Sequence, residues 1–174
     1  MRNCIESLLP GGEDVEILIV DDGSKDNSGR LCDEWAKKSN KIKAVHKKNA
    51  GLGMARNTGL EHVTGNYVMF IDSDDYLAEN VVEKLLEKLL TEKVDAAFTG
   101  MIRFNDDKIL SEVDRKYKDN TFRENELCEK YLMEMAGTLP DEPIDSYLYM
   151  SVCTGLYSCL LYTSDAADEA RSVD

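Results

Sequence analysis

The sequence lacks the marks of three kinds of protein. It has no apolar run approaching the 18 or more residues of a membrane-spanning helix, and no basic segment followed by an apolar one at its start. Lysine and arginine are outnumbered by acidic residues, 21 against 34, for a net charge of -13. Because nucleic acids and anionic membranes are bound by clustered basic side chains, neither is expected as a partner.

Paired cysteines and spaced histidines are missing as well. The cysteines are odd in number and form no Cys-x-x-Cys motif: Cys4, Cys32, Cys128, Cys153 and Cys159. This pattern favours reduced thiols in a cytoplasmic protein over a disulfide framework or a zinc site. The two histidines, His46 and His62, have no ligand spacing and are expected to be incidental. The thiols are expected to serve as small apolar core residues.

Strands and helices alternate along the first hundred residues of a chain with enough apolar content, 43%, for one domain with a core. The expected strands are residues 15–22, 41–48, 65–72 and 94–104, and the expected helices are residues 1–10, 29–39, 52–63 and 78–93. This alternation predicts an α/β protein with a doubly wound, mostly parallel sheet.

The pattern weakens after residue 105. It keeps a hint of a strand at 109–113 and a moderately amphipathic helix at 124–137. Residues 159–174 show neither periodicity nor turn chemistry, and they resemble a translated sequencing adapter rather than a native element.

Carboxylates crowd the ends of two expected strands. Asp72, Asp74 and Asp75 follow "YVMFI", and Asp21 and Asp22 follow "ILIV". Parallel strands end at one edge of a sheet, where ligands bind in open α/β folds, so these side chains are expected to cluster there. Carboxylates held this close repel one another unless a cation lies between them, and oxygen ligands suit Mg²⁺ or Mn²⁺ bound to a diphosphate.

Each acidic motif also has a purely structural interpretation. Asp74 or Asp75 can cap the helix expected to start near Glu79. "DDGSKDNS" can be a turn in which Asp26 or Ser28 caps the next helix.

The glycine-containing segment "NAGLGMARN" is open to two interpretations in the same way. It can be a structural loop, or a loop whose amides approach a phosphate, with Arg56 as the counter-charge.

The order and separation of "ILIVDDGSKDNS" and "NAGLGMARNTGLEHVTGNYVMFIDSDDYL" closely resemble those of the family 2 glycosyltransferases, inverting enzymes of GT-A fold that use nucleotide sugars. The resemblance implies that Asp22 contacts the nucleotide base, that Asp72 helps to hold the ribose, and that Asp74 and Asp75 supply the metal ligand. The full set expected to bind the nucleotide sugar is Asp21, Asp22, Gly51, Arg56, Asp72 and Asp74.

The resemblance also divides the chain. Residues 1–104 correspond to the nucleotide-sugar-binding half and residues 105–158 to the start of the acceptor-side region, which leaves 159–174 as a non-native tail. Family members begin with a strand that would precede Met1. We therefore expect a truncated chain whose sheet has a gap or an improvised pairing between residues 16–21 and 66–72.

The catalytic base is unknown. The family's later acidic pair has no match before about residue 158, and Asp168 and Glu169 lie in the suspect tail. The resemblance therefore implies metal-assisted transfer of a sugar from a UDP-linked donor to a saccharide or lipid-linked acceptor in bacterial surface-polysaccharide synthesis, with little transfer by this chain alone. The expected place is the cytoplasm, including the inner membrane face.

Two other functions remain open from the sequence. The chain can be a nucleotide-sugar-binding remnant without turnover. It can also be a phosphatase-like hydrolase with an aspartate nucleophile, although such enzymes favour Thr or Val shortly after the second aspartate, where this chain has Asp75 and Tyr76.

Overall fold

The computed structural model describes residues 1–10, 12, 14–105, 108–113, 121 and 152–163. The helices are α1 (Arg2–Leu8), α2 (Ser28–Lys38), α3 (Leu52–His62), α4 (Val81–Glu92), the 3₁₀ turn η3 (Val152–Thr154) and α6 (Leu160–Thr163). The strands are β1 (Ile17–Asp21), β2 (Ile42–His46), β3 (Tyr67–Met69), β4 (Ala96–Phe98), β5 (Met101–Asn105), β6 (Lys108–Val113) and β7 (Gly155–Ser158).

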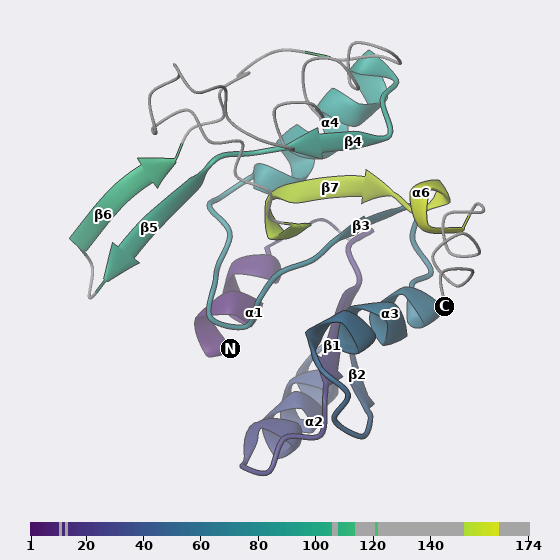
Figure 1. Cartoon of the computed structure of the whole chain (residues 1–174), viewed down its shortest axis with the longest axis vertical. Helices are drawn as coiled ribbons and strands as arrows, with labels where there is room; N and C mark the ends of the chain where they lie inside the picture. The colour runs from purple at the N-terminus through teal and green to yellow at the C-terminus, as the bar shows by residue number, and fades with distance from the viewer. Residues whose placement is uncertain (11, 13, 106–107, 114–120, 122–151, 164–174) are drawn as a thin grey trace, which may run out of the picture.

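The strands form three separate hydrogen-bonded groups (Figure 1). β1 and β2 pair in parallel, with Ile17 opposite Ile42 and Asp21 opposite His46. β7 lies between β3 and β4 and is antiparallel to both, so β3 and β4 run in the same direction. β5 and β6 form an antiparallel hairpin that extends to one side of the molecule.

Among the described residues, β1 and β3 are not joined by strand pairing. The predicted gap between residues 16–21 and 66–72 is therefore confirmed. The four aspartates that were expected at one edge of one sheet instead follow strands of two sheets. Strand pairing therefore does not bring these aspartates together, and only side chains and helices can connect them.

Two apolar clusters match the two main sheets. The first contains Ile5, Trp35 and the two strand residues Ile17 and Ile42, which ties α1 and α2 to the β1–β2 pair. The second is formed by α4, β4 and β7 from Leu85, Leu89, Ala97 and Leu156. The helical spacing of Leu85 and Leu89 places both on the face of α4 that covers the sheet.

Helix α3 also packs on the first sheet. A Cβ on Gly59 would lie 3.6 Å from Cγ2 of Val20, an ordinary contact distance, so α3 lies close against β1. Figure 1 shows α3 lying across the β1–β2 pair, with the chain rising from the end of α3 to β3.

Several sequence expectations need correction after residue 94. The single strand expected at 94–104 is two strands, β4 and β5, separated by Thr99 and Gly100. The hint of a strand at 109–113 is confirmed by β6. The helix expected at 124–137 lies outside the described residues.

The last described segment departs from the expectation too. β7 is the middle strand of a sheet, although its sequence carries no strong strand signal. Residues 160–163, expected to carry no element, form α6, and the amide of Cys159 donates to the carbonyl of Asn66 at 2.9 Å. No helix in the described part of the chain is long and apolar enough to cross a bilayer.

Candidate functional site

The turn after β1 is organised by Asp21. Its Oδ1 accepts a hydrogen bond from the amide of Ser24 at 3.0 Å, and its Oδ2 lies 2.9 Å from Nδ1 of His46. These bonds, with Ser24 as the larger cause, hold the pKa of the Asp21 carboxyl below its usual value. Nε2 of His46 lies 3.0 Å from Oδ1 of Asp33, so the ring bridges β1 and α2. The two carboxylates raise the pKa of His46.

Asp22 holds the loop before α3. Its carboxylate accepts from the ammonium of Lys47 at 2.5 Å, from the amide of Ala50 at 3.0 Å and from the amide of Gly51 at 2.8 Å. The bond from Lys47 is the main reason that the pKa of Asp22 is lowered. Gly51 stands at the N-cap of α3 with φ of 89°, a conformation that glycine adopts without strain.

The turn "DDGSKDNS" needs a glycine at one position. Gly23 has φ of 72°, and a Cβ there would lie 2.7 Å from the amide nitrogen of Asn49. Asn27 is the N-cap residue of α2 and makes no side-chain capping bond, but Asp26 accepts from the amide of Ser28, the first residue of the helix, at 2.9 Å. The expected capping role of Asp26 is therefore confirmed from one position further upstream than the N-cap, and Ser28 lies within the helix.

Asp72 forms an ion pair with Arg56 of α3, the arginine of the candidate site. The distance from Nη2 of Arg56 to Oδ1 of Asp72 is 3.2 Å. The guanidinium also lies 6.0 Å from the ring centre of Phe70 and 3.5 Å from Sγ of Cys153. α3 thus contacts Asp22 through Gly51 and Asp72 through Arg56, and it links the two strand ends that the sheets leave apart.

The residues between β3 and α4, numbers 70 to 80, carry the remaining carboxylates; we call this segment the acidic loop. The amide of Asp75 donates to the carbonyl of Asp72 at 3.0 Å, which closes a turn with Asp74 in it. Asp74 and Asp75 are exposed as whole residues. Partial desolvation of the Asp75 carboxyl, and then the charges of Asp74 and Asp72, raise the pKa of Asp75. The turn therefore holds three carboxylates that repel one another.

The acidic loop does not serve as a helix cap. α4 begins at Val81, its N-cap is Asn80, and no side chain caps it by a hydrogen bond. Neither Asp74 nor Asp75 thus occupies the position that the capping interpretation requires. Their exposure and mutual repulsion remain to be explained by another role.

The acidic loop fits a cation held partly by a substrate. Within the ranges that the structure describes, no three or more His, Cys, Asp or Glu side chains gather into a complete metal site. Mg²⁺ commonly takes only one or two protein carboxylates and completes its shell with phosphate and water oxygens. Asp74 and Asp75 meet that smaller requirement.

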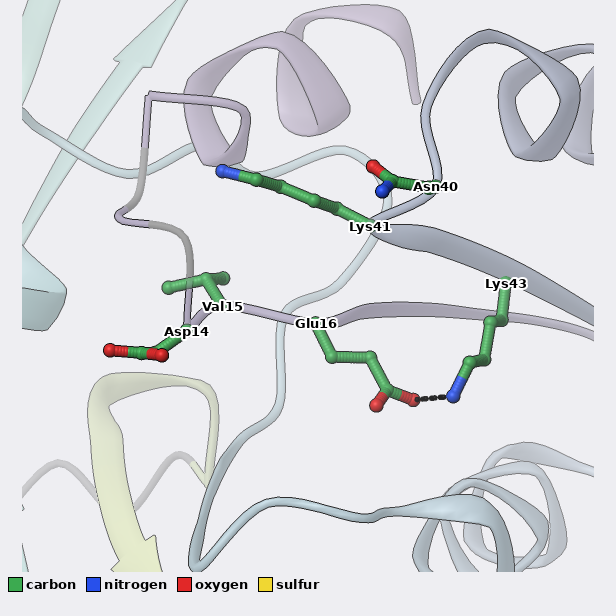
Figure 2. A pocket seen from close by; sticks show the side chains of 6 residues that line it. All are labelled: Asp14, Val15, Glu16, Asn40, Lys41 and Lys43. Atoms are coloured by element: carbon green, nitrogen blue, oxygen red, sulfur yellow. Dashed lines mark ion pairs between the residues drawn. The ribbon is translucent and has the colours of Figure 1, made fainter.

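A cleft elsewhere in the molecule is distinct from this site. Figure 2 shows its lining, Asp14, Val15, Glu16, Asn40, Lys41 and Lys43, with an ion pair of 3.0 Å between Glu16 and Lys43. These residues lie at the amino ends of β1 and β2, whereas Asp21 and Asp22 lie at the carboxyl end of β1. The cleft is therefore at the opposite end of the strands from the aspartates.

Sequence reasoning missed two contributors to the site. His46 was expected to be incidental, and Lys47 was not considered, yet both bind a carboxylate of the turn after β1. Their position could have identified them. His46 ends β2 and Lys47 follows it, and because β2 is parallel to β1 their side chains reach the carboxyl end of β1. Cys4 and Cys32 are buried thiols, as expected of small core residues, whereas Cys153 and Cys159 are half-buried and Cys128 lies outside the described residues.

Comparison with known proteins bears on this geometry. A family model described as "Glycosyl transferase family 2" matches residues 1–140. The chain is 39% identical over 107 residues to the glycosyltransferase GlyA of Streptococcus pneumoniae serotype 4, and 35% identical over 109 residues to the uncharacterized glycosyltransferase EpsJ of Bacillus subtilis. It is 37% identical over 90 residues to the minor teichoic acid biosynthesis protein GgaB of Bacillus subtilis.

Each match covers a larger share of this chain than of the relative. They include 61%, 62% and 49% of this chain, but only 15%, 32% and 10% of GlyA, EpsJ and GgaB respectively. The chain therefore spans no more than about a third of the length of these curated relatives.

Proposed function

Because this chain belongs to glycosyl transferase family 2, with that family's α/β GT-A fold, we propose that it is the donor-binding part of a glycosyltransferase. It binds a nucleotide diphosphate sugar, UDP-linked, at the acidic loop and the turn after β1. In the whole protein an acceptor hydroxyl attacks the anomeric carbon and inverts it. The observation that carries the proposal is the turn that holds Asp72, Asp74 and Asp75 together with one arginine.

The charge in the acidic loop supports a diphosphate with a divalent cation as the ligand. Arg56 offsets the charge of Asp72, while the pKa of Asp75 is raised by burial and by its two acidic neighbours. Mg²⁺ or Mn²⁺ held by Asp74 or Asp75 would offset this repulsion, and it would stabilise the negative charge that develops on the leaving diphosphate. Arg56 would supply a counter-charge to a phosphate of the donor, and Asp72, which it contacts, would help to hold the ribose.

The turn after β1 supports the nucleotide end of the donor. A carboxylate has about four lone-pair positions, and Asp22 accepts from Lys47, from Gly51 and, through both oxygens, from Ala50. An N–H of a nucleobase would therefore replace one of these contacts, of which the second bond from Ala50, at 3.2 Å, is the longest to a backbone amide. Because its other bonds fix its orientation, Asp22 would present that acceptor at little conformational cost.

The proposal extends to the acceptor and the cellular context. GgaB is named for teichoic acid biosynthesis, and this supports a saccharide or lipid-linked acceptor in surface-polysaccharide synthesis. We place the reaction in the cytoplasm, including the inner face of the membrane, because the cysteines are odd in number and form no Cys-x-x-Cys motif.

The direct test is a calorimetric titration of UDP into the 174-residue chain, with and without Mn²⁺. We expect binding that Mn²⁺ strengthens at least about tenfold, because the cation joins the diphosphate to the carboxylates. Asp14→Asn is the control, since it removes one exposed carboxylate at the opposite end of β1. Binding of UDP that does not respond to Mn²⁺ would contradict the metal-assisted proposal.

A second candidate is nucleotide-sugar binding without turnover by this chain. Loss of a positioned general base lowers a rate by about 10² to 10⁴, and most of each relative's length has no counterpart here. We therefore expect UDP binding without measurable sugar transfer. An assay of donor hydrolysis and transfer beside the titration separates the two, because transfer at a rate typical of an enzyme would contradict the second candidate.

A further inference from the structure

Helix α1 contacts the acidic loop at Asp72 and at Leu77, which stand before and after Asp74 and Asp75 in the sequence. Sγ of Cys4 donates to the carbonyl of Asp72 at 3.7 Å, and Oγ of Ser7 accepts from the amide of Leu77 at 3.1 Å. Residues three apart lie on one face of a helix, so a single face of α1 holds both contacts. Asp74 and Asp75 lie between the two attached residues.

The contact from Ser7 has a defined direction. Its hydroxyl donates its proton to the carbonyl of Cys4 at 2.7 Å, one turn earlier in α1. A serine hydroxyl has one proton and two lone pairs, so the proton is committed to the helix and a lone pair is left for the amide of Leu77. Ser7 therefore acts toward the acidic loop as an acceptor.

The helix that provides these contacts is itself fixed to the other half of the site. Ile5 is buried among Ile17, Trp35 and Ile42, so α1 moves with the β1–β2 pair. β1 and β3 share no strand pairing in the described chain. Hence α1 is one of the few connections by which the turn at Asp22 and the acidic loop keep a fixed relative position.

We propose that Ser7 is a positioning residue, which holds the acidic loop so that Asp74 and Asp75 face the cation-bound diphosphate of a donor whose base lies at Asp22. The proposal rests on the proposed function for the identity of that ligand. Ser7 does not touch the ligand. Ser7 acts through the amide of Leu77. Removing its hydroxyl would keep Asp74 and Asp75 in the chain, but it would leave the acidic loop less rigidly held.

The test compares Ser7→Ala with Ser7→Thr, which keeps the hydroxyl. Ser39→Ala is the matched control. Oγ of Ser39 also accepts a hydrogen bond from a backbone amide, that of Lys41 at 3.3 Å, but Ser39 stands at the C-cap of α2, far from the acidic loop in the sequence. UDP is titrated with and without Mn²⁺. We expect Ser7→Ala to weaken Mn²⁺-dependent UDP binding about fivefold, the effect of losing one neutral hydrogen bond.

The readouts also separate positioning from general stability. Ser7→Ala should leave metal-free UDP binding unchanged, and Ser7→Thr should restore the metal-dependent part. An equal loss of metal-dependent and metal-free binding, or the same loss in Ser39→Ala, would overturn the proposal. So would binding by Ser7→Ala that equals that of the wild-type chain.

Hydrogen exchange of the backbone amides at residues 72–77 keeps the test independent of the ligand. We expect faster exchange in Ser7→Ala than in the wild-type chain, in the absence of UDP, with Ser7→Thr close to the wild type. If the wild-type chain does not bind UDP but this difference is found, the proposed function fails while Ser7 still positions the loop. Unchanged exchange would overturn the role of Ser7 whatever the ligand.

Discussion

Nη2 of Arg56 lies 3.2 Å from Oδ1 of Asp72 and joins a helix packed on one sheet to the loop that follows a strand of another. The two side chains are partly exposed, with 28% and 43% of their surface accessible. An exposed ion pair contributes about 0 to 1 kcal/mol to stability. The pair therefore matters mainly for the arrangement of the site.

Arg56→Ala should weaken Mn²⁺-dependent UDP binding about tenfold or more, the effect of losing a hydrogen bond to a charged group. The melting temperature should change little, because the pair is partly exposed. Arg30→Ala is the control, since it breaks the exposed pair between Arg30 and Glu34 within α2. The prediction is checked by calorimetry and thermal unfolding. If both variants affect UDP binding equally, Arg56 has no specific role.

Asp74→Asn and Asp75→Asn should each reduce the response of UDP binding to Mn²⁺, because each removes a charged oxygen that we propose as a candidate metal ligand in the acidic loop. The pKa of Asp75 is raised in the folded chain. At a pH above the ordinary aspartate pKa of about 4, the charged Asp75 therefore destabilises the folded chain. Asp75→Asn should therefore raise the melting temperature slightly at pH 7. A large loss of stability with an unchanged response to Mn²⁺ would show that these residues are structural.

His46 should make stability depend on pH. Its folded-state pKa is raised by Asp21 and Asp33, so its stabilising effect is complete below the ordinary histidine value of about 6.5 and is lost as pH rises through the higher folded value. The difference in melting temperature between the wild type and His46→Ala should thus be larger at pH 6 than at pH 8.5.

His62→Ala is the control for this pH effect, since His62 contacts the carbonyl of Thr58 and, among the described residues, no carboxylate. A nuclear magnetic resonance titration of both rings measures the shift directly. A difference between wild type and His46→Ala that stays constant from pH 6 to 8.5 would contradict the bridging role of His46.

Leu156→Ala should lower the free energy of unfolding by about 2 to 5 kcal/mol, the usual effect of truncating a buried leucine. Leu156 is 4% exposed and packs in β7 against Leu85, Leu89 and Ala97. Leu160→Ala is the control, because Leu160 is 72% exposed. Denaturant unfolding provides the measurement. A similar small effect of both substitutions would mean that β7 does not belong to the core in solution.

The local elements of the first ninety residues could be predicted from the sequence alone. Periodicity is a short-range property, so "ILIV" indicates β1, and the spacing of Leu85 and Leu89 indicates α4, whatever their neighbours are. The candidate aspartates were found in the same way, because strand ends in an α/β pattern are where polar residues gather. Their combined motifs also matched a family.

Only the tertiary structure decided what connects these elements. β7 pairs with β3 from nearly ninety residues away and with β4 from about sixty, and no local pattern encodes such pairing. The same holds for His46 between Asp21 and Asp33, and for Ser7 on the amide of Leu77, because these bonds depend on which elements lie side by side. The sequence by itself thus determined which residues are charged and which segments are regular, while packing decided which partners hold each charge.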